Sequence, residues 1–349
     1  MEPAAAMKLS LRKTAALFIL IVFLILLPWI IRDEYYIHSI TVILLFAYLA
    51  SAWNIVGGFA GQLSLGHAAF VGLGAYTSSL LFLRWGISPW LGMFPGALMA
   101  VIGAVLIGYP CFRLRGPDYA LSTLAFTWIL LDIVLSTERF AGFDIRGAMG
   151  VRIQLLGHSP ANFQFAHNWY FYYIILVMLF IAIGASSFIT RSKLGSYLSA
   201  IREDQDVASS VGVNAAKYKM YAGIVSAFLT AFGGTFLAQL QLYVDPFQFF
   251  GAGLSIEIAL GAIIGGMGTL MGPVVGMILL RSMSEIARTY LGGTYAGAHL
   301  VLYGVLLILV MMYLPHGIIK PLEKILARFS SKENGKKELP KAVYHQEKN

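Results

Sequence analysis

The sequence predicts an all-α fold, a polytopic transmembrane helical bundle, and two observations carry that prediction. Hydrophobic residues make up 58% of the 349 residues and charged residues only 12%, whereas soluble domains carry roughly a quarter charged residues. Several apolar stretches approach the roughly 20 residues that a helix needs to cross a bilayer. These stretches do not alternate as the strands of a transmembrane barrel do, so the predicted spans are helices.

Taken in chain order, the apolar stretches predict about 8–10 membrane segments. The clear ones cover residues 14–31, 37–56, 63–83, 87–109, 119–136, 169–190, 220–242 and 300–314. Two further segments between 254 and 290 are separated by Gly265, Gly266 and Gly268. The first of them, 254–264, is too short to span alone at 1.5 Å per residue. It predicts a broken or re-entrant helix, which membranes tolerate where it is buried in protein or lines a water-filled cavity.

Positive charge gathers at the ends of the spans and orients the chain. Lysines and arginines lie before the first span, around Arg113, in the loop 195–219 and from Lys320 onward. Cytoplasmic loops collect such residues, so both termini are predicted to be cytoplasmic. This location also argues against a nucleic-acid partner. The predicted organisation is a cytoplasmic end (1–13), a permease domain (14–318) with an external loop (137–168) and a cytoplasmic coupling loop (195–219), and a polar cytoplasmic tail (319–349).

Glycine-rich segments supply candidates for a translocation path. Residues 52–76 hold six glycines among polar side chains, and glycine-interrupted segments in two halves of a membrane protein point to a midplane substrate site. The candidates are Asn54, Gln62, Ser64, His67, Glu257, Gly265 and Gly266. Close helix packing by itself accounts for most of the glycines. Structural hydrogen bonding is the alternative role for His67, and contact with water at a segment end is the alternative for Glu257.

The loop 195–219 interrupts the apolar sequence with charges, serines and small residues, so it must lie outside the bilayer. The chain contains no GxxxxGK[ST] loop for nucleotide phosphates. It also contains no HExxH, no GxSxG and no spaced Cys/His cluster, and Cys111 is its one cysteine. We therefore predict no catalytic residue, no metal site and no cofactor bound by this chain. If ATP drives transport, another chain must bind it.

Within this loop, the stretch from Asp206 to Gly212 resembles the EAA motif of ABC importer permeases, whose core reads E-A-A-x-x-x-G. Aspartate stands for the glutamate and Val207 for the first alanine, while Ala208 and Gly212 match. The downstream I-x-L-P element of other permeases is absent. Small residues let a short helix enter a groove on an ATPase, and Gly212 can end that helix in a left-handed cap. The candidate coupling residues are Arg202, Glu203, Asp204, Asp206, Ala208 and Gly212.

A wider resemblance joins five ordered motifs between about residues 50 and 318. They read WNIVGGFAGQLSLGHAAFVGLGAYTSSLL, FRLRGPDYALSTLAF, AIREDQDVASSVGVNAAKYKMYAGIVSAFLTAFGG, IIGGMGTLMGPVVG and YGVLLILVMMYLPHGI. Together they resemble the longer permease subunit of branched-chain amino acid (LIV-type) ABC importers. The resemblance implies a multi-pass protein of the bacterial inner membrane, with two ATPase subunits that bind ATP and Mg²⁺, a second homologous permease and a periplasmic substrate-binding protein.

Other readings of the sequence stay open. Relatives import urea or short amides, so the solute is not determined by the resemblance. A self-sufficient secondary transporter also has broken helices, although it would need buried ionisable residues for ion coupling. In a channel or a structural membrane subunit, the glycine-rich segments would serve packing alone.

Overall fold

The computed structural model describes residues 22–291, apart from 115, 141 and 158, together with a few isolated positions between 304 and 319. The predicted cytoplasmic end 1–13 lies outside the described residues. So do residues 14–21 of the predicted span 14–31, most of the predicted span 300–314 and nearly all of the tail 319–349.

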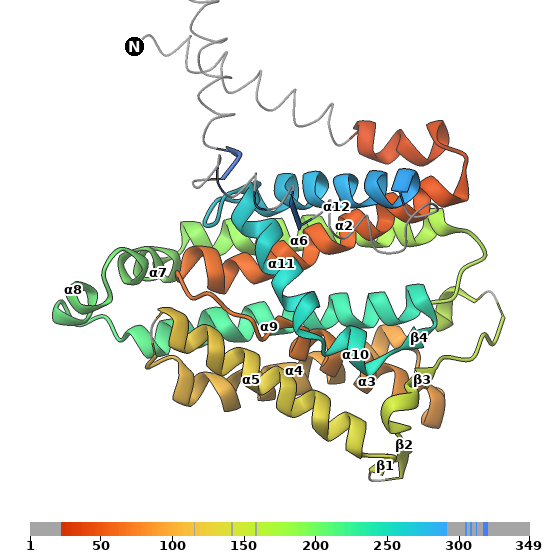
Figure 1. Cartoon of the computed structure of the whole chain (residues 1–349), viewed down its shortest axis with the longest axis horizontal. Coiled ribbons are helices and arrows are strands. Elements are labelled where there is room, and N and C mark those ends of the chain that lie inside the picture. The colour runs from red at the N-terminus through yellow and green to blue at the C-terminus, as the bar shows by residue number, and fades with distance from the viewer. Residues whose placement is uncertain are drawn as a thin grey trace, which may run out of the picture.

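The chain folds into a bundle of long helices that run along its longest axis (Figure 1). The long helices are α2 (Glu34–Asn54), α3 (His67–Trp85), α4 (Pro89–Cys111), α5 (Gly116–Ser136), α6 (Asn168–Arg191), α9 (Ala215–Gln241) and α12 (Gly272–Leu291). The shorter ones are α7 (Lys193–Glu203), α8 (Gln205–Ser210), α10 (Pro246–Phe249) and α11 (Ala252–Gly265). The strands β1 (Arg139–Phe140), β2 (Phe143–Asp144), β3 (Val151–Arg152) and β4 (Tyr243–Val244) form two small antiparallel pairs, β1–β2 and β3–β4.

Six helical stretches in the described part of the chain are long and apolar enough to cross a membrane. They are Glu34–Phe59, Pro89–Cys111, Gly116–Ser136, Asn168–Arg191, Ala215–Gln241 and Pro246–Gly265. Helices α3 and α12, of 19 and 20 residues, belong to the same bundle. The predicted polytopic helical membrane protein is thereby confirmed.

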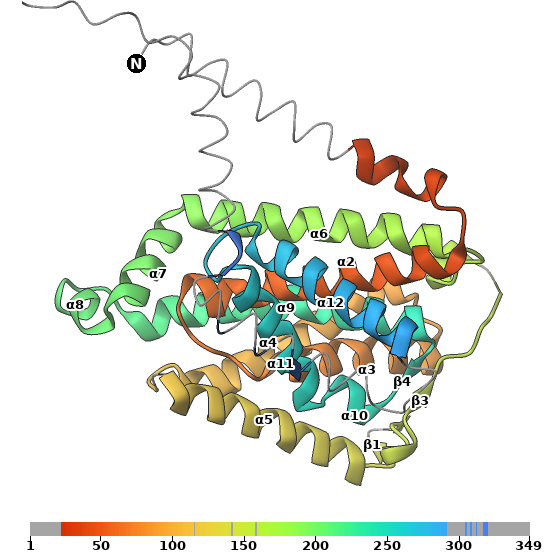
Figure 2. The ribbon, with the colours of Figure 1, turned by 45° about the horizontal axis from the view of Figure 1, so that its top comes forward.

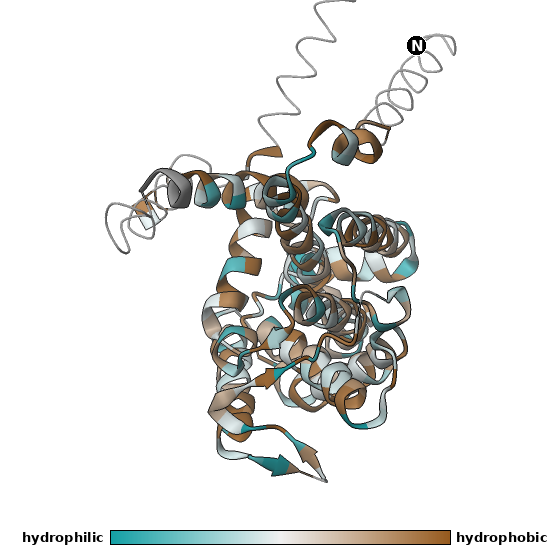
Figure 3. Ribbon diagram, turned by 90° about the vertical axis from the view of Figure 1, so that its right-hand side faces the viewer, coloured by the Kyte–Doolittle hydropathy of each residue, from teal (hydrophilic) through white to brown (hydrophobic). Residues whose placement is uncertain are grey.

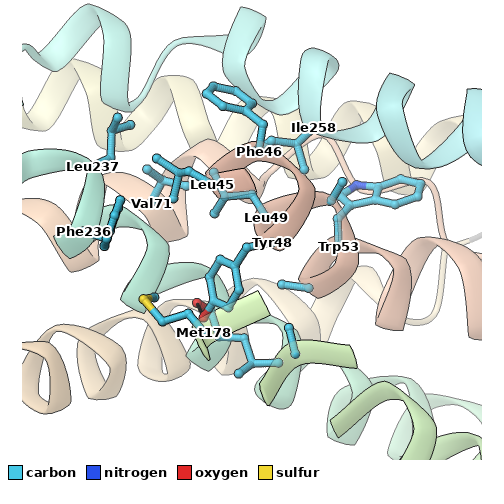
Figure 4. Close-up of a cluster of buried hydrophobic side chains, with 14 of the residues drawn as sticks. Leu45, Phe46, Tyr48, Leu49, Trp53, Val71, Met178, Phe236, Leu237 and Ile258 are labelled. Carbon is cyan, nitrogen blue, oxygen red and sulfur yellow. Dashed lines mark hydrogen bonds between the residues drawn. The ribbon is translucent and has the colours of Figure 1, made fainter. Parts of the chain in front are cut away.

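Helix α2 forms the centre of the bundle. In the segment Glu34–Phe59, which contains α2, 83% of the most apolar stretch is buried inside the protein, whereas only 22% is buried in α5. Helix α2 is therefore surrounded by protein, and α5 lies at the periphery. Figure 4 shows Leu45, Leu49 and Trp53 of α2 packed among side chains of the neighbouring helices. The Tyr48 hydroxyl donates to the carbonyl oxygen of Leu229 at 2.6 Å. In lipid, such close packing and interhelical hydrogen bonding replace the hydrophobic effect as the force that holds helices together.

Glycines allow the closest of these helix contacts. A Cβ built on Gly74 of α3 would overlap the carbonyl oxygen of Ala231 of α9, and one built on Gly234 of α9 would overlap that of Val71. The two backbones therefore touch, and any larger residue would force α3 and α9 apart. For these positions the packing interpretation of the glycines is sufficient.

The predicted span 63–83 begins later than expected, at His67. The preceding residues 60–66 are not helical, and Gly61 has a φ of 67° in the left-handed region. The indole Nε1 of Trp53 donates to the carbonyl oxygen of Ser64 at 2.7 Å, so this loop is held by a side chain of α2. Hydropathy alone does not register such a break, because the loop holds the apolar residues Leu63 and Leu65.

A second break separates α11 from α12, as predicted. Helix α11 has 14 residues, which at 1.5 Å per residue reach about 21 Å, less than the thickness of the bilayer core. Gly266 and Gly268 have φ values of 123° and 77°, which a residue with a side chain rarely adopts. The chain reverses within residues 266–271, which we call the break loop.

The bundle has two distinct ends. Helices α7 and α8 project beyond the long helices at one end, whereas the four short strands lie at the opposite end (Figure 1, Figure 2). Seen from the strand side, the hairpin β1–β2 at the lower edge carries both hydrophilic and hydrophobic residues (Figure 3). We call residues 192–214 the α8 end and residues 137–167 the strand end.

Candidate functional site

The α8 end is a compact helix pair with a built-in turn. Asp204 separates α7 from α8, and its Oδ1 accepts from the backbone N–H groups of Asp206 (2.8 Å) and Val207 (3.1 Å). This is an N-cap, which satisfies donors that the first turn of a helix leaves without partners. Among the predicted coupling residues, Asp204 therefore shapes the element and Asp206 lies exposed at its first turn.

Gly212 ends α8 in the left-handed region with a φ of 88°. Behind it, the N–H of Val213 donates to the carbonyl oxygen of Ala208 at 3.0 Å. The space around Gly212 is open, so the backbone conformation, not a steric contact, favours glycine there.

Buried contacts attach α8 to the bundle. Ala208 is 2% exposed and packs with Ile201 and Ala215, so its methyl group faces inward. The fully buried Lys219 of α9 donates from Nζ to Oε1 of Gln205 at 2.6 Å. A buried ammonium requires such partners, and this one ties the start of α8 to α9.

The outer side of α8 presents two valines that the sequence did not single out. Val207 is 62% exposed and Val211 is 76% exposed, and a spacing of four residues puts them on one face of the helical turn. Single exposed apolar residues are ordinary, but this pair sits at the tip of a projecting polar element. The one sequence signal for Val207 was its replacement of the first alanine of the motif core.

At the break loop, Asn54 holds the chain in place. Its Nδ2 donates to the carbonyl oxygen of Thr269 and its Oδ1 accepts from the N–H of Gly268, both at 2.9 Å. Asn54 is 1% exposed, so both halves of its amide are used by the protein itself. It belongs to the last turn of α2, directly before the π-helical turn η1 (Ile55–Phe59).

The predicted glycines of the break serve close approach. A Cβ on Gly265 would overlap the carbonyl oxygen of Gly272, and one on Gly276 would overlap that of Gly261. Helices α11 and α12 are thus in backbone contact beside the break. Gly266 instead supplies the backbone conformation that starts the reversal.

His67 lies at the start of α3 in a closed hydrogen-bond chain. Ser226 Oγ donates to the carbonyl oxygen of Ala52 at 2.7 Å, so toward His67 it acts as acceptor for Nε2 at 2.8 Å. Nδ1 lies 3.0 Å from Ser64 Oγ. Because Ser226 Oγ donates its one proton to Ala52, Nε2 carries a proton in this network.

A cavity of about 20 Å³ lies beside this network, which is room for about one water molecule. An amino acid does not fit into it. Gln62, 7% exposed, keeps its Oε1 without a hydrogen-bond partner among the described residues. The structure thus brings Ser64 and His67 together at the start of α3, whereas Gln62 lies outside this network and does not line the cavity.

Glu257 takes no part in the His67 network and instead forms an ion pair with Arg281 inside the bundle. Its Oε1 lies 2.7 Å from Nε of Arg281, and its Oε2 accepts from Nη2 at 3.0 Å. The guanidinium also lies over the ring of Phe46, 3.4 Å from the centroid. This arrangement joins α11, α12 and α2, and it gives the carboxylate a partner inside the membrane segment.

The strand end contains a pocket of about 220 Å³ lined by Arg84, Arg146 and Arg152. Asp144, the one carboxylate of its lining, is 2.6 Å from Arg139 at the rim. Positive charge therefore exceeds negative charge in this concave surface. No sequence pattern marked these arginines, because they come from the end of α3 and from two separate positions of the loop.

Backbone pairing connects this pocket to the broken segment. Strand β3 pairs with β4, with Val151 opposite Val244. The Tyr243 hydroxyl donates to the carbonyl oxygen of Met149 at 2.9 Å. Because β4 directly precedes α10 and α11, the loop of the strand end is fixed to the start of the broken helix.

Within the part of the chain that the structure describes, no three His, Cys, Asp or Glu residues group together as metal ligands.

Comparisons with known proteins agree on one family. The model of the family described as "Branched-chain amino acid transport system / permease component" matches residues 35–311. The high-affinity branched-chain amino acid transport system permease protein LivM of Escherichia coli is 27% identical over 80% of this chain and 68% of its own length. LivH of Salmonella typhimurium is 25% identical over 78% of this chain and 91% of its own, and BraD of Pseudomonas aeruginosa is 24% identical over 81% and 94%. No solved structure matches the chain.

Proposed function

Because the chain belongs to the family of branched-chain amino acid permease components, we propose that it is the membrane-spanning subunit of an ATP-driven importer. The cargo is a branched-chain or related amino acid. The complex contains a second homologous permease, two ATPase subunits that bind Mg²⁺ and ATP, and a periplasmic binding protein. Its place is the bacterial inner membrane, with the α8 end in the cytoplasm and the strand end outside.

One observation carries the coupling part of this proposal. The α8 end presents Val207 and Val211 outward while Ala208 and Lys219 fix the same helix inward. An apolar knob on a rigid base suits a groove on another protein, where buried aliphatic side chains supply contact area. The chain itself has no phosphate-binding loop, so a separate ATPase subunit must bind to its surface. In this proposal, the α8 end is the surface that it contacts.

The translocation path runs along the two breaks, in this proposal. Broken helices at membrane depth occur where backbone lines a cavity or is buried in protein. Asn54 connects the end of α2 to the break loop, and Ser64 and His67 meet at the start of α3, shortly after the buried Gln62 in the sequence. The cavity beside His67 is too small for an amino acid, so transport requires these segments to move apart.

At the opposite end, the arginine-lined pocket supports docking of the binding protein. Its excess positive charge favours an acidic surface on that partner. The pairing of β3 with β4 gives such a contact a direct route to α10 and α11.

The test is uptake by proteoliposomes that contain this chain, the second permease and the ATPase from the same genome, with the binding protein outside. Radiolabelled leucine should accumulate only with Mg²⁺-ATP on the α8 side, and a partner ATPase lacking its phosphate-loop lysine should abolish uptake. ATP-dependent uptake of urea or acetamide in place of leucine would identify the amide importer. Uptake that continues without ATP would identify a secondary transporter and contradict the proposal.

The path is tested separately by single cysteines at Asn54, Gln62 and His67. Leucine delivered by the binding protein should slow their reaction with a small thiol reagent if they line the path. The parent chain, whose only cysteine is the buried Cys111, is the control for each added cysteine. Reaction rates that are indifferent to substrate would assign all three side chains to packing.

A further inference from the structure

We propose that Arg202 couples the docking element to the break loop, so that movement of α7 and α8 is transmitted to α11 and α12 through this one side chain. The inference rests on the proposed function and extends it to a positioning residue. Arg202 is the penultimate residue of α7 and is an exposed residue, yet its guanidinium contacts the bundle. Its Nη1 donates to the carbonyl oxygen of Gly58 at 2.9 Å.

The acceptor is a backbone group that the fold leaves available. Gly58 belongs to the π-helical turn η1, which ends at Phe59, and the last carbonyl groups of a helix lack partners within it. A cation near a helix C-terminus also interacts favourably with the helix dipole. The stem of Arg202 passes over Gly61, where its Cγ lies 3.1 Å from the position of a built Cβ.

The same guanidinium touches the break loop. A Cβ built on Gly268 would overlap Nη1 of Arg202, and the carbonyl oxygen of Gly58 lies 2.9 Å from that position. Asn54, one turn before Gly58, binds Gly268 and Thr269. Three segments far apart in the sequence, near residues 58, 202 and 268, therefore meet at one point without an intermediate residue.

Helix α7 is able to act as a unit at this point. Leu198 and Ile201 are buried on its inner side, and Asp204 joins its end to the capped start of α8. A partner that shifts α8 consequently shifts Arg202. The break loop can follow, because Gly266 and Gly268 occupy backbone conformations of the kind found at hinges, where a few residues absorb a large change of φ and ψ.

A simpler role for Arg202 is to cap the helix that ends at Phe59. Capping alone would contribute to stability in every state and would not connect ATP hydrolysis to the break loop. Two measurements distinguish the roles: the number of solute molecules transported per ATP hydrolysed, and the response of the break loop to ATP. Coupling through Arg202 affects both, whereas capping alone affects neither.

The experiment uses the complete reconstituted complex with three variants. Arg202→Ala removes the contact, Arg202→Lys keeps the charge, and Arg191→Ala removes an exposed arginine of the same end as a matched control. We expect Arg202→Ala to lower leucine uptake per ATP about tenfold or more, the factor for losing a hydrogen bond to a charged group. ATPase activity and complex assembly should stay within about twofold of wild type. Arg202→Lys should restore part of the ratio, and Arg191→Ala should match wild type.

A reporter cysteine at Met271, which is 44% exposed in the break loop, gives a second readout. Its reaction rate with a thiol reagent should change on ATP binding in the parent complex and stay constant in Arg202→Ala. If Arg202→Ala lowers only the thermal stability, while uptake per ATP and the response at Met271 match the parent, the side chain is a cap and the inference is overturned. Absence of ATP-dependent uptake in the wild-type complex would instead overturn the proposed function.

Discussion

At the α8 end, two valines face outward from a helix that buried contacts hold in place, whereas at the strand end Arg84 of α3 and two arginines of the loop line a pocket. An apolar contact surface depends on shape and close packing. A charged surface acts at longer range and weakens with salt. The two ends therefore suit two kinds of association, a stable one at α8 and a transient one at the strands.

Both ends nevertheless connect to the same broken helices. Arg202 reaches the break loop from the α8 side, and the pairing of β3 with β4 reaches the start of α10 and α11 from the other. The comparison teaches that α10–α11 is held at both of its ends by elements that project from the bundle. The predictions below are ordered by the size of the expected effect.

The largest effect is expected from charged residues in place of Val207 and Val211, the two exposed valines of α8. The double variant Val207→Asp and Val211→Asp should weaken ATPase binding about a hundredfold or more, since truncating or charging a central interface residue costs at least about 2 kcal/mol. Methionine at both positions should preserve binding because the surface stays apolar. Co-purification and titration of the ATPase measure the effect, and wild-type affinity in the aspartate variant would place the interface elsewhere.

The inward face of the same helix should respond differently. Ala208→Glu buries a carboxylate among Ile201 and Ala215, at a cost of several kcal/mol, so α8 should detach and become open to proteolysis. ATPase binding then falls about tenfold, together with protection from the protease. Loss of binding with α8 still protected would show that Ala208 contacts the ATPase itself.

At the strand end, reversing charge should weaken the binding protein's association in a salt-dependent way. Arg146→Glu with Arg152→Glu should lower its affinity about tenfold at low ionic strength and less at high salt. Lys193→Glu at the α8 end is the matched control and should leave this affinity unchanged. Equal loss at all salt concentrations would contradict an electrostatic role for the pocket.

The smallest functional effect is expected from Glu257→Gln. The carboxylate pairs with Arg281 between α11 and α12, and removing one partner of a partly buried pair lowers stability by about 1–3 kcal/mol. The melting temperature should therefore fall by several degrees while the KM for leucine uptake stays within about twofold of wild type. A large rise in KM with unchanged stability would show that Glu257 contributes to substrate transport and not only to stability.

The spans could be predicted from sequence because each needs only a local run of apolar residues. The break after α11 could be predicted in the same way, because three glycines within four residues (Gly265, Gly266 and Gly268) disfavour a continuous helix. The start of α3 could not be placed in this way. Residues 60–66 leave the helix because Trp53 and Gly61 hold them, and the sequence does not reveal which side chain meets which carbonyl group.

The candidate site divides along the same line. The capping roles of Asp204 and Gly212 follow from neighbours within four residues, so residue type and spacing indicate them. The directions of Ala208, Val207 and Arg202 depend on where α7 and α8 sit against the bundle. For Asn54 and Glu257, the partners Gly268 and Arg281 lie 214 and 24 residues away.

By itself, the sequence determined that this chain crosses a membrane repeatedly and that a helix breaks near Gly265. These properties depend on short-range hydropathy, charge and backbone conformation. Only the tertiary structure decided that Arg202 faces the break loop, that Val207 and Val211 face outward, and that three arginines share one pocket. Those arrangements are set by contacts between distant segments, and the free energy of such a contact depends on geometry that no local pattern encodes.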